Sequence, residues 1–370
     1  MKNNSIKYPL TNTVLDNDDI ESGVKVLKSK WITMGRETLK FENTFSKKIS
    51  NRSSIMVNSG SSANLLIFQC LINPKVNKLK KDDEVLIPAI CWSTSLWPII
   101  QSGLKVKFVD IDPKTLNIDP QKIKAAIREQ TSAILATHCF GNACDIAAIE
   151  KIAKEYGLKV IYDAAHCFGT KYKGKSIFGY GDISTTSLHA TKLMHSVEGG
   201  VVFSQNEELI KRMVYLRNFG HAGFEKFNGL GINAKNSEFH AAMGLCVLED
   251  IELILAKRKE QSLMYDELLS AMPVTKPLIQ EDCNFNYAYY PILFESEAIT
   301  LKVKAALEAE GIFPRRYFYP SLSSLDYVKN SATPVSDDCA SRILCLPLYF
   351  ELKLSQQETI SRIIEKTIVL

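Results

Sequence analysis

The stretch STTSLHATKLMHSVEGGVVFS, residues 184–204, holds the pattern that decides the fold. A strand-like run ends near Ser187, a polar segment with Lys192 follows, and a Glu-Gly-Gly turn starts a second apolar run at Gly200. Similar runs recur upstream, with helix-forming stretches between them. The seven runs are 55–57, 84–87, 106–109, 133–136, 159–162, 183–188 and 200–203. Alternating strands and helices predict a seven-stranded, mostly parallel sheet sandwiched by helices.

The helices expected between these runs are 61–71, 93–101, 120–127 and 145–156. After residue 237 the pattern changes to one long helix, 237–270, followed by a mixture of both element types. Strands are expected at 287–294 and 314–319, and helices at 298–308 and 357–367. We therefore predict an α/β large domain with an N-terminal arm, residues 1–245, and a smaller α+β C-terminal domain, residues 246–370.

The composition excludes several classes of protein. The 370 residues carry a net charge of only +4, which gives no electrostatic reason to expect a nucleic-acid partner. No run reaches the roughly 18 apolar residues of a membrane-spanning helix, so we expect no membrane partner. The nine cysteines form no C-x-x-C pair, so we expect reduced thiols in a cytoplasmic protein and no metal site.

Three residues near strand ends are candidates for chemistry. Lys192 lies in a loop beyond a strand, where open α/β sheets gather functional groups; it is either a solvated surface lysine or a nucleophile that attacks an aldehyde. Asp163 ends the run 159–162 and is either a loop carboxylate or the partner of a pyridine nitrogen. His166 is either a structural histidine or a group that orients Asp163 or a cofactor oxygen.

Two upstream features point to a flat, phosphorylated ligand. Residues 58–63, Asn-Ser-Gly-Ser-Ser-Ala, follow a strand and open a helix, where small residues and a helix N-terminus can bind phosphate. Without a Walker motif, this turn can equally be an ordinary helix cap. Trp92 begins a loop after another strand and is either a core residue or an aromatic that stacks on a cofactor ring.

The order of these elements resembles the DegT/DnrJ/EryC1/StrS family of nucleotide-sugar aminotransferases. These enzymes have the fold type I of aspartate aminotransferase and use pyridoxal 5′-phosphate (PLP). The resemblance runs from about Tyr8 to the C-terminus. The matching stretches are 108–112, 162–166, 181–182, 187–192, 198–200, 216–220 and 231–233.

The resemblance implies the catalytic roles. Lys192 would form the Schiff base with PLP and then move the proton, and Asp163 would pair with the pyridine nitrogen. His166 would lie near the ring oxygen, and Trp92 would stack on the ring.

The resemblance also implies the remaining contacts. Gly60, Ser61 and Ser187 would hold the phosphate. Asn233 would reach the phosphate of a neighbouring subunit, which implies a homodimer with shared active sites. The substrate side would include three residues, His189, Arg315 and Tyr317.

The implied reaction transfers an amino group from L-glutamate to a nucleotide-linked keto-6-deoxy sugar. Residues 315–322 and 231–239 resemble transaminases that make dTDP-4-amino-4,6-dideoxy-D-glucose, whose product would enter a surface polysaccharide such as an O-antigen. A 3-keto sugar or a GDP- or UDP-linked sugar stays open. One departure is Lys235, where the family often has arginine, because lysine keeps the charge and loses the bidentate fork.

Three other readings compete with this one. The N-terminal half resembles the sugar 3-dehydratases of the same family, which carry histidine at the lysine position, so Lys192 favours transamination. A second reading is a PLP-binding sensor without catalysis. A third is a nicotinamide-dependent oxidoreductase, but Gly229-Leu-Gly-Ile-Asn-Ala234 comes late in the chain, whereas a dinucleotide fingerprint follows a first strand.

Overall fold

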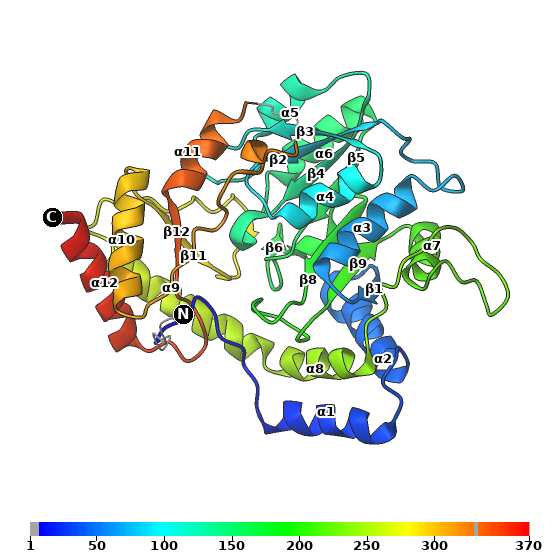
Figure 1. Ribbon diagram of the computed structural model, residues 1–370, viewed down its shortest axis with the longest axis horizontal. Coiled ribbons are helices and arrows are strands. Elements are labelled where there is room, and N and C mark those ends of the chain that lie inside the picture. Colours follow the sequence, from blue (N-terminus) through cyan, green and yellow to red (C-terminus); the bar gives the residue numbers. More distant parts are fainter. Residues whose placement is uncertain (1–6, 329–331, 370) are drawn as a thin grey trace.

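The computed structural model describes residues 7–328 and 332–369, and its centre is a seven-stranded sheet in the order β1-β9-β8-β5-β4-β2-β3 (Figure 1). The strands are β1 Ser53–Val57, β2 Glu84–Pro88, β3 Lys105–Val109, β4 Thr131–Thr137, β5 Lys159–Asp163, β8 Ile183–Ser187 and β9 Gly200–Ser204. Only β9 runs antiparallel to its neighbours, β1 and β8. The predicted seven-stranded, mostly parallel sheet is confirmed.

Both faces of this sheet are buried, and alternate residues of each strand serve opposite faces. In β2, Val85 and Ile87 pack toward one layer of helices while Leu86 packs toward the other. The first layer contains α3 Gly60–Leu71, α4 Ser93–Gln101 and α7 Glu207–Arg217. The second contains α2 Arg36–Thr44, α5 Pro120–Ala126, α6 Ile146–Tyr156 and α8 Glu238–Glu249. This two-sided burial explains why the strands read as continuous apolar runs.

Helix ends follow the local sequence signals. In α6, the Asp145 side chain accepts a hydrogen bond from the Ala148 N–H, and Gly157 ends the helix at a φ of 69°. A positive φ of this kind suits glycine, which has no Cβ to clash. The helices expected at 61–71, 93–101, 120–127 and 145–156 are all present, with ends that differ by one residue at most.

The single long helix expected over 237–270 is wrong, because the chain forms two helices there. Helix α8 ends at Glu249, and α9 Ile251–Leu268 begins after Asp250, whose φ and ψ are −90° and −1°. Helix α8 packs on α1 Asn17–Ser29 and α2, whereas α9 packs on α12 Leu354–Val369 (Figure 1). Two different packing partners require two different helix directions, which periodicity along the sequence does not reveal.

The C-terminal part has its own core. The two-stranded sheet of β11 Tyr290–Leu293 and β12 Ile343–Leu346 packs with α10 Glu297–Ala309 and α12 around Tyr265, Phe294 and Leu307. Helix α11 Pro334–Arg342 precedes β12. The strand expected at 287–294 is therefore shorter, and the helices expected at 298–308 and 357–367 are present.

The strand expected at 314–319 is wrong. This segment makes one isolated bridge, between Arg315 and Cys345. Pro314 and Pro320 have no N–H to donate to a strand partner, and Tyr317 and Phe318 are buried against the cavity described below. The segment is therefore an irregular wall of that cavity and adds no strand to the sheet.

Short elements complete the chain. They are the π-helical turn η1 Phe45–Ser50, the 3₁₀ turns η2 Cys139–Gly141, η3 Ile177–Gly179 and η4 Leu322–Ser324, and the small sheet of β6 Lys171–Tyr172, β7 Lys175–Ser176 and β10 Cys283–Asn284. None of the described helices combines the length and apolar character needed to cross a membrane.

The N-terminal segment crosses to the C-terminal part. Tyr8 bridges Ile312, and its ring packs beside the C-terminal core. The proposed domain boundary between residues 245 and 246 stays a prediction; the helix break at Asp250 lies close to it.

Candidate functional site

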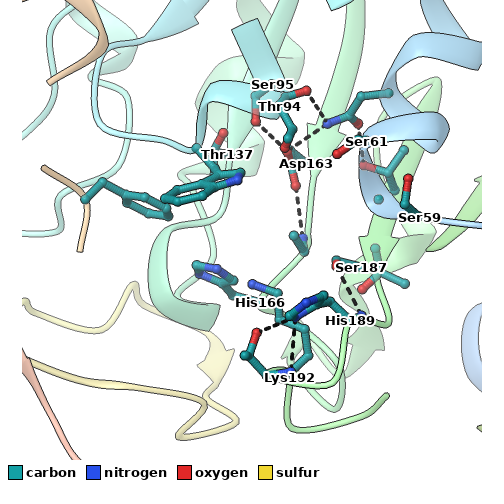
Figure 2. Close-up of a pocket in the computed structure, with 18 of the residues that line it drawn as sticks. Ser59, Ser61, Thr94, Ser95, Thr137, Asp163, His166, Ser187, His189 and Lys192 are labelled. Atoms are coloured by element: carbon teal, nitrogen blue, oxygen red, sulfur yellow. Dashed lines mark hydrogen bonds between the residues drawn. The ribbon is translucent and has the colours of Figure 1, made fainter. Parts of the chain in front are cut away.

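The carboxyl ends of β4, β5 and β8 open into one cavity of about 240 Å³ (Figure 2). The parallel strands bring their C-terminal loops to the same edge of the sheet, which is where sites form in open α/β folds. Ten of the eleven site residues predicted from the sequence line this cavity. They are Gly60, Ser61, Trp92, Asp163, His166, Ser187, His189, Lys192, Arg315 and Tyr317.

Asp163 ends β5 and is 4% exposed. Its Oδ2 accepts hydrogen bonds from Ser95 Oγ at 2.6 Å and from Asn64 Nδ2 at 3.1 Å, and its Oδ1 accepts one from the Ala165 N–H at 3.1 Å. All of these donors are neutral. The carboxylate is thus held in place by Asn64, Ser95 and the backbone, and His166 does not orient it.

The Lys192 amine points into the cavity from the loop after β8 (Figure 2). Its Nζ donates to the Tyr289 hydroxyl at 3.3 Å and lies 5.8 Å and 5.9 Å from the ring centroids of Tyr289 and Tyr317. No carboxylate pairs with this amine within the described residues. An amine held only by an aromatic hydroxyl is available for covalent chemistry, so Lys192 is not a solvated surface lysine.

His166 is buried among aromatic rings. It lies parallel to Phe318 at 5.5 Å, and its Nε2 lies 3.5 Å from the Tyr317 hydroxyl. Burial, and next the nearby charge of Lys192, lower the pKa of the His166 imidazole well below its usual range. Its Nδ1 is buried without a partner in the described part of the chain. The neutral ring therefore keeps one nitrogen free beside the cavity.

The turn between β1 and α3 is a phosphate-type site. Ser59 caps α3 by accepting a hydrogen bond from the Ser62 N–H at 3.0 Å. The N–H groups of Gly60 and Ser61 belong to the first turn of the helix and have no acceptor within residues 7–328 and 332–369. A Cβ on Gly60 would lie 3.0 Å from the Ser187 Cβ, so glycine lets the Ser187 hydroxyl approach the turn.

The outer rim of the cavity is aromatic and cationic. Trp92 is 41% exposed, which excludes the core alternative for this residue. The Arg315 guanidinium lies 5.3 Å from the Trp92 ring and 5.0 Å from the Tyr317 ring. It forms no ion pair within the described residues. The rim therefore offers an unpaired positive charge between two aromatic faces.

His189 also lines the cavity, and both of its ring nitrogens have partners. Nδ1 accepts a hydrogen bond from the Thr191 N–H at 3.2 Å, and Nε2 lies 3.4 Å from Glu198 Oε1. The Glu198 backbone is fixed, because its carbonyl accepts hydrogen bonds from Ser196 Oγ at 2.9 Å and from Asn236 Nδ2 at 3.0 Å. A substrate group that meets His189 must therefore compete with Glu198.

Asn233 does not line the cavity. It is exposed beyond the end of β1, where its carbonyl accepts a hydrogen bond from Asn58 Nδ2 at 3.1 Å and its Oδ1 accepts one from Lys235 Nζ at 2.8 Å. Burial, and next the charge of Arg217, lower the pKa of Lys235. The predicted contact of Asn233 with another subunit's phosphate stays a prediction.

Several residues at the site were not identified from the sequence. Asn64 contacts Asp163 from α3, where it is a buried polar residue in the apolar run Ala63–Leu71, and this contrast is a usable signal. Ser95 lies three residues after Trp92 in a serine- and threonine-rich helix start, and its role had no distinct signal. Tyr289 reaches the site only through tertiary structure, whereas Glu198 belongs to the same segment as Lys192 but was given no role.

The residues present fit pyridoxal 5′-phosphate. The free N–H groups at the α3 N-terminus suit a phosphate, the Lys192 amine suits an aldehyde, and the buried Asp163 carboxylate suits a protonated ring nitrogen. The described residues contain no group of three or more His, Cys, Asp or Glu side chains arranged to hold a metal ion.

Comparison with known proteins agrees with this geometry. The profile of the DegT/DnrJ/EryC1/StrS aminotransferase family matches residues 13–366. A dTDP-4-amino-4,6-dideoxy-D-glucose transaminase from Shigella dysenteriae is 38% identical over 287 residues, 75% of this chain and 77% of that protein. A GDP-4-keto-6-deoxy-D-mannose 3-dehydratase from Yersinia pseudotuberculosis is 32% identical over 332 residues, 84% of each protein.

Solved structures support the same assignment. The structure of DesI in the presence of its TDP-sugar product superposes with a TM-score of 0.86 at 27% identity, covering 96% of this chain and 91% of that one. Together with the site geometry, these matches show that the chain belongs to the DegT/DnrJ/EryC1/StrS aminotransferase family, whose cofactor is pyridoxal 5′-phosphate.

Proposed function

We propose that this nucleotide-sugar aminotransferase moves the amino group of L-glutamate to the keto group of dTDP-4-keto-6-deoxy-D-glucose. The products are 2-oxoglutarate and dTDP-4-amino-4,6-dideoxy-D-glucose. The amino sugar would then enter a surface polysaccharide such as an O-antigen. The observation that carries the proposal is the presence of the Lys192 amine, the buried Asp163 carboxylate and the α3 N-terminus around one cavity.

The cofactor supplies an aldehyde carbon and a ring that accepts electrons when the substrate loses a proton. Gly60, Ser61 and Ser187, which line the cavity, would bind the phosphate, and Asp163 would hold a positive charge at the ring nitrogen. The Lys192 Nζ would take the proton from the α-carbon of the amino donor and deliver it to the aldehyde-derived carbon of the cofactor, as a positioned general base and acid.

Lys192 also distinguishes transamination from dehydration. A transaminase must release and recapture its cofactor through a lysine amine, whereas the sugar 3-dehydratases that this chain resembles carry histidine at that position. Of the two histidines that line the cavity, His189 is the nearer to Lys192 along the sequence, three residues before it, and it is paired with Glu198. The amine at position 192 therefore favours transfer of nitrogen over loss of water, although a dehydratase is among the relatives.

The sugar is proposed from two similarities. The Shigella relative is a dTDP-4-amino-4,6-dideoxy-D-glucose transaminase, and DesI was solved with a TDP-sugar product. Other relatives act on GDP- and UDP-linked sugars, and one of them on a 3-oxo sugar. GDP- or UDP-linked sugars and a 3-keto position are therefore the alternatives. The Arg315 guanidinium at the cavity mouth suits an anionic part of any of these substrates.

We also propose a homodimer with shared sites. Helix α1 packs on α8 with one face, and its other face leaves apolar side chains exposed at Ile20, Val24 and Leu27, which are 59%, 40% and 56% exposed. We propose that a second copy covers this stripe, and that the exposed Asn233 meets the phosphate bound in the neighbouring subunit. Leu27→Asp should convert a dimer to a monomer in sedimentation; a wild-type monomer would contradict the proposal.

The reaction is tested in two steps. Adding L-glutamate to the PLP-loaded protein should remove the visible absorbance of the lysine-bound cofactor, and a passive PLP binder would leave it unchanged. The amine form is then offered dTDP-, GDP- and UDP-linked 4-keto-6-deoxy sugars in parallel. Return of the original absorbance identifies the substrate, and NMR of the product shows whether nitrogen enters at C3 or C4. No return with any 4-keto sugar would contradict the proposed reaction.

A further inference from the structure

The Asp163 carboxylate is a buried charge without a positive partner in the described chain. It is 4% exposed, and its three hydrogen bonds come from Asn64, Ser95 and the Ala165 N–H, all neutral. Burying an unpaired charge is costly unless hydrogen bonds and an opposite charge compensate it. Since no cation of the described residues contacts it, this carboxylate is suited to a cation that enters the cavity.

The two carboxylate oxygens are used unequally. Oδ2 accepts two hydrogen bonds, from Ser95 at 2.6 Å and Asn64 at 3.1 Å, whereas Oδ1 accepts one, from the Ala165 N–H at 3.1 Å. A carboxylate oxygen accepts about two such bonds. Oδ1 therefore keeps capacity for one more donor, and Oδ2 does not.

The orientation of the Asn64 side chain is fixed by its own hydrogen bonds. Its Oδ1 accepts a hydrogen bond from Thr185 Oγ1 at 2.9 Å, while its Nδ2 donates to Asp163 Oδ2 and to the Thr94 carbonyl at 3.2 Å. A flipped amide would aim its oxygen at two acceptors, so this orientation is determined. Thr185 and Asn64 are each 2% exposed, so water does not compete for these bonds.

We infer that Thr185, Asn64 and Ser95 are positioning residues that hold the Asp163 carboxylate with its Oδ1 available to a protonated ring nitrogen. Donors to the carboxylate stabilise the ion pair of carboxylate and pyridinium relative to the neutral pair, in which the proton has moved to the acid. Thr185 acts through Asn64, whose N–H donation it orients and polarises. This inference rests on the proposed function, because PLP supplies the pyridine nitrogen.

The test measures the protonation of the ring nitrogen directly. Wild type and variants are loaded with PLP labelled with ¹⁵N in the ring, and the ¹⁵N chemical shift is recorded across pH. Wild type should show the pyridinium shift up to a midpoint in the upper part of the pH range. In Asn64→Ala and Thr185→Val the midpoint of the change to the neutral shift should fall by about one pH unit, since one lost hydrogen bond corresponds to roughly a ten-fold change.

A double variant tests whether Thr185 acts through Asn64 or whether each substitution disturbs the site independently. If Thr185 acts through Asn64, Thr185→Val should change nothing further in the Asn64→Ala background. Thr300→Val is the matched control, because Thr300 is fully buried in α10 and donates to the carbonyls of Ser296 and Arg342, far from the cavity. Its ¹⁵N profile should equal that of wild type.

The outcomes distinguish this inference from the proposed function. If wild type binds no PLP, the proposed function fails. If all variants bind PLP and the ¹⁵N profiles of Asn64→Ala and Thr185→Val coincide with wild type, the positioning role is wrong and the function stands. Additive effects of the two substitutions would also overturn the relay from Thr185 through Asn64.

Discussion

The two walls of the cavity differ in how completely their polar groups are satisfied. On the inner wall, at the end of β5, Asp163 is buried and bonded to Asn64, Ser95 and the backbone before any ligand arrives. On the outer wall, Arg315 is exposed and has no acidic partner in the described residues, and Trp92 is 41% exposed. The inner wall is preorganised, whereas the outer wall has unused binding capacity.

This difference separates two tasks. Positioned groups in a dry environment stabilise charge without rearranging, which suits a cofactor that stays bound. Exposed groups with unused hydrogen-bonding capacity suit substrates that enter and leave. Substitutions on the inner wall should therefore alter the chemistry of the cofactor, and substitutions on the outer wall should alter the binding of substrates.

The largest effect is expected for substitution of Lys192, whose amine points into the cavity. Lys192→Ala removes both the covalent attachment and the proton carrier, and kcat should fall by about 10⁴-fold, at the upper end for a positioned acid–base group. Added small amines should restore part of the rate, because they replace the missing base. A variant that keeps wild-type turnover would contradict the role of Lys192.

The next effect belongs to the inner wall. Asp163→Asn keeps the shape and removes the charge, so kcat should fall by roughly 10²–10³-fold, with weaker PLP affinity measured by fluorescence titration. Ser95→Ala, which removes one of three donors to the same carboxylate, should lower kcat by only about ten-fold. Equal losses in both variants would contradict the ranking of charge above hydrogen bonding.

A smaller effect, of a different kind, is expected on the outer wall. Arg315→Met should raise the KM for an anionic substrate about 10–100-fold while kcat and the absorbance of the bound cofactor stay near wild type. Separate titrations of L-glutamate and of the nucleotide sugar show which anion the guanidinium binds. A large change in the absorbance of the cofactor would place Arg315 on the inner wall instead.

The smallest effect on activity is expected for His138, a buried residue that directly follows β4. His138 is buried beneath Tyr162, and burial lowers the pKa of its imidazole to about 3. The unfolded chain binds this proton below pH ~6.5, so the contribution to stability is present above that pH and is lost as pH falls toward 3.

The measurement compares wild type with His138→Asn. Between pH 7 and pH 5, the unfolding free energy of wild type should drop by about 2 kcal/mol more than that of the variant, followed by urea denaturation. Activity at pH 7 should change little in the fraction that is folded. Parallel pH profiles of stability would show that His138 titrates normally in the folded chain.

The sheet could be predicted from the sequence because each strand produces a pattern within a few consecutive residues. Each parallel strand is buried on both faces and reads as an apolar run. The candidate groups Asp163 and Ser187 end their strands, and Lys192 follows the second of them. The break at Asp250 was missed because it reflects packing of α8 and α9 on different partners. The 314–319 segment was misread because it forms only one isolated bridge, and its consecutive residues Tyr317 and Phe318 both line the cavity instead of alternating across a sheet.

The candidate site, like the fold, could be predicted only in part from the sequence. Most residues proposed to touch the cofactor carry recognisable chemistry, and the structure brings all of them except Asn233 to one cavity, whereas residues that contact those residues were not identified. Asn64 and Ser95 are ordinary polar residues until the fold brings them to within 3.1 Å and 2.6 Å of Asp163. Tyr289, almost 100 residues from Lys192, meets it only because the C-terminal part packs over the cavity.

The central claim is a covalent bond between PLP and the Lys192 Nζ, and peptide mapping tests it directly. The PLP-loaded protein is reduced with borohydride, digested and analysed by mass spectrometry. The account predicts one modified peptide, carrying the reduced cofactor at Lys192. Reduction that labels another lysine, or leaves Lys192 unmodified while PLP is bound, would contradict it.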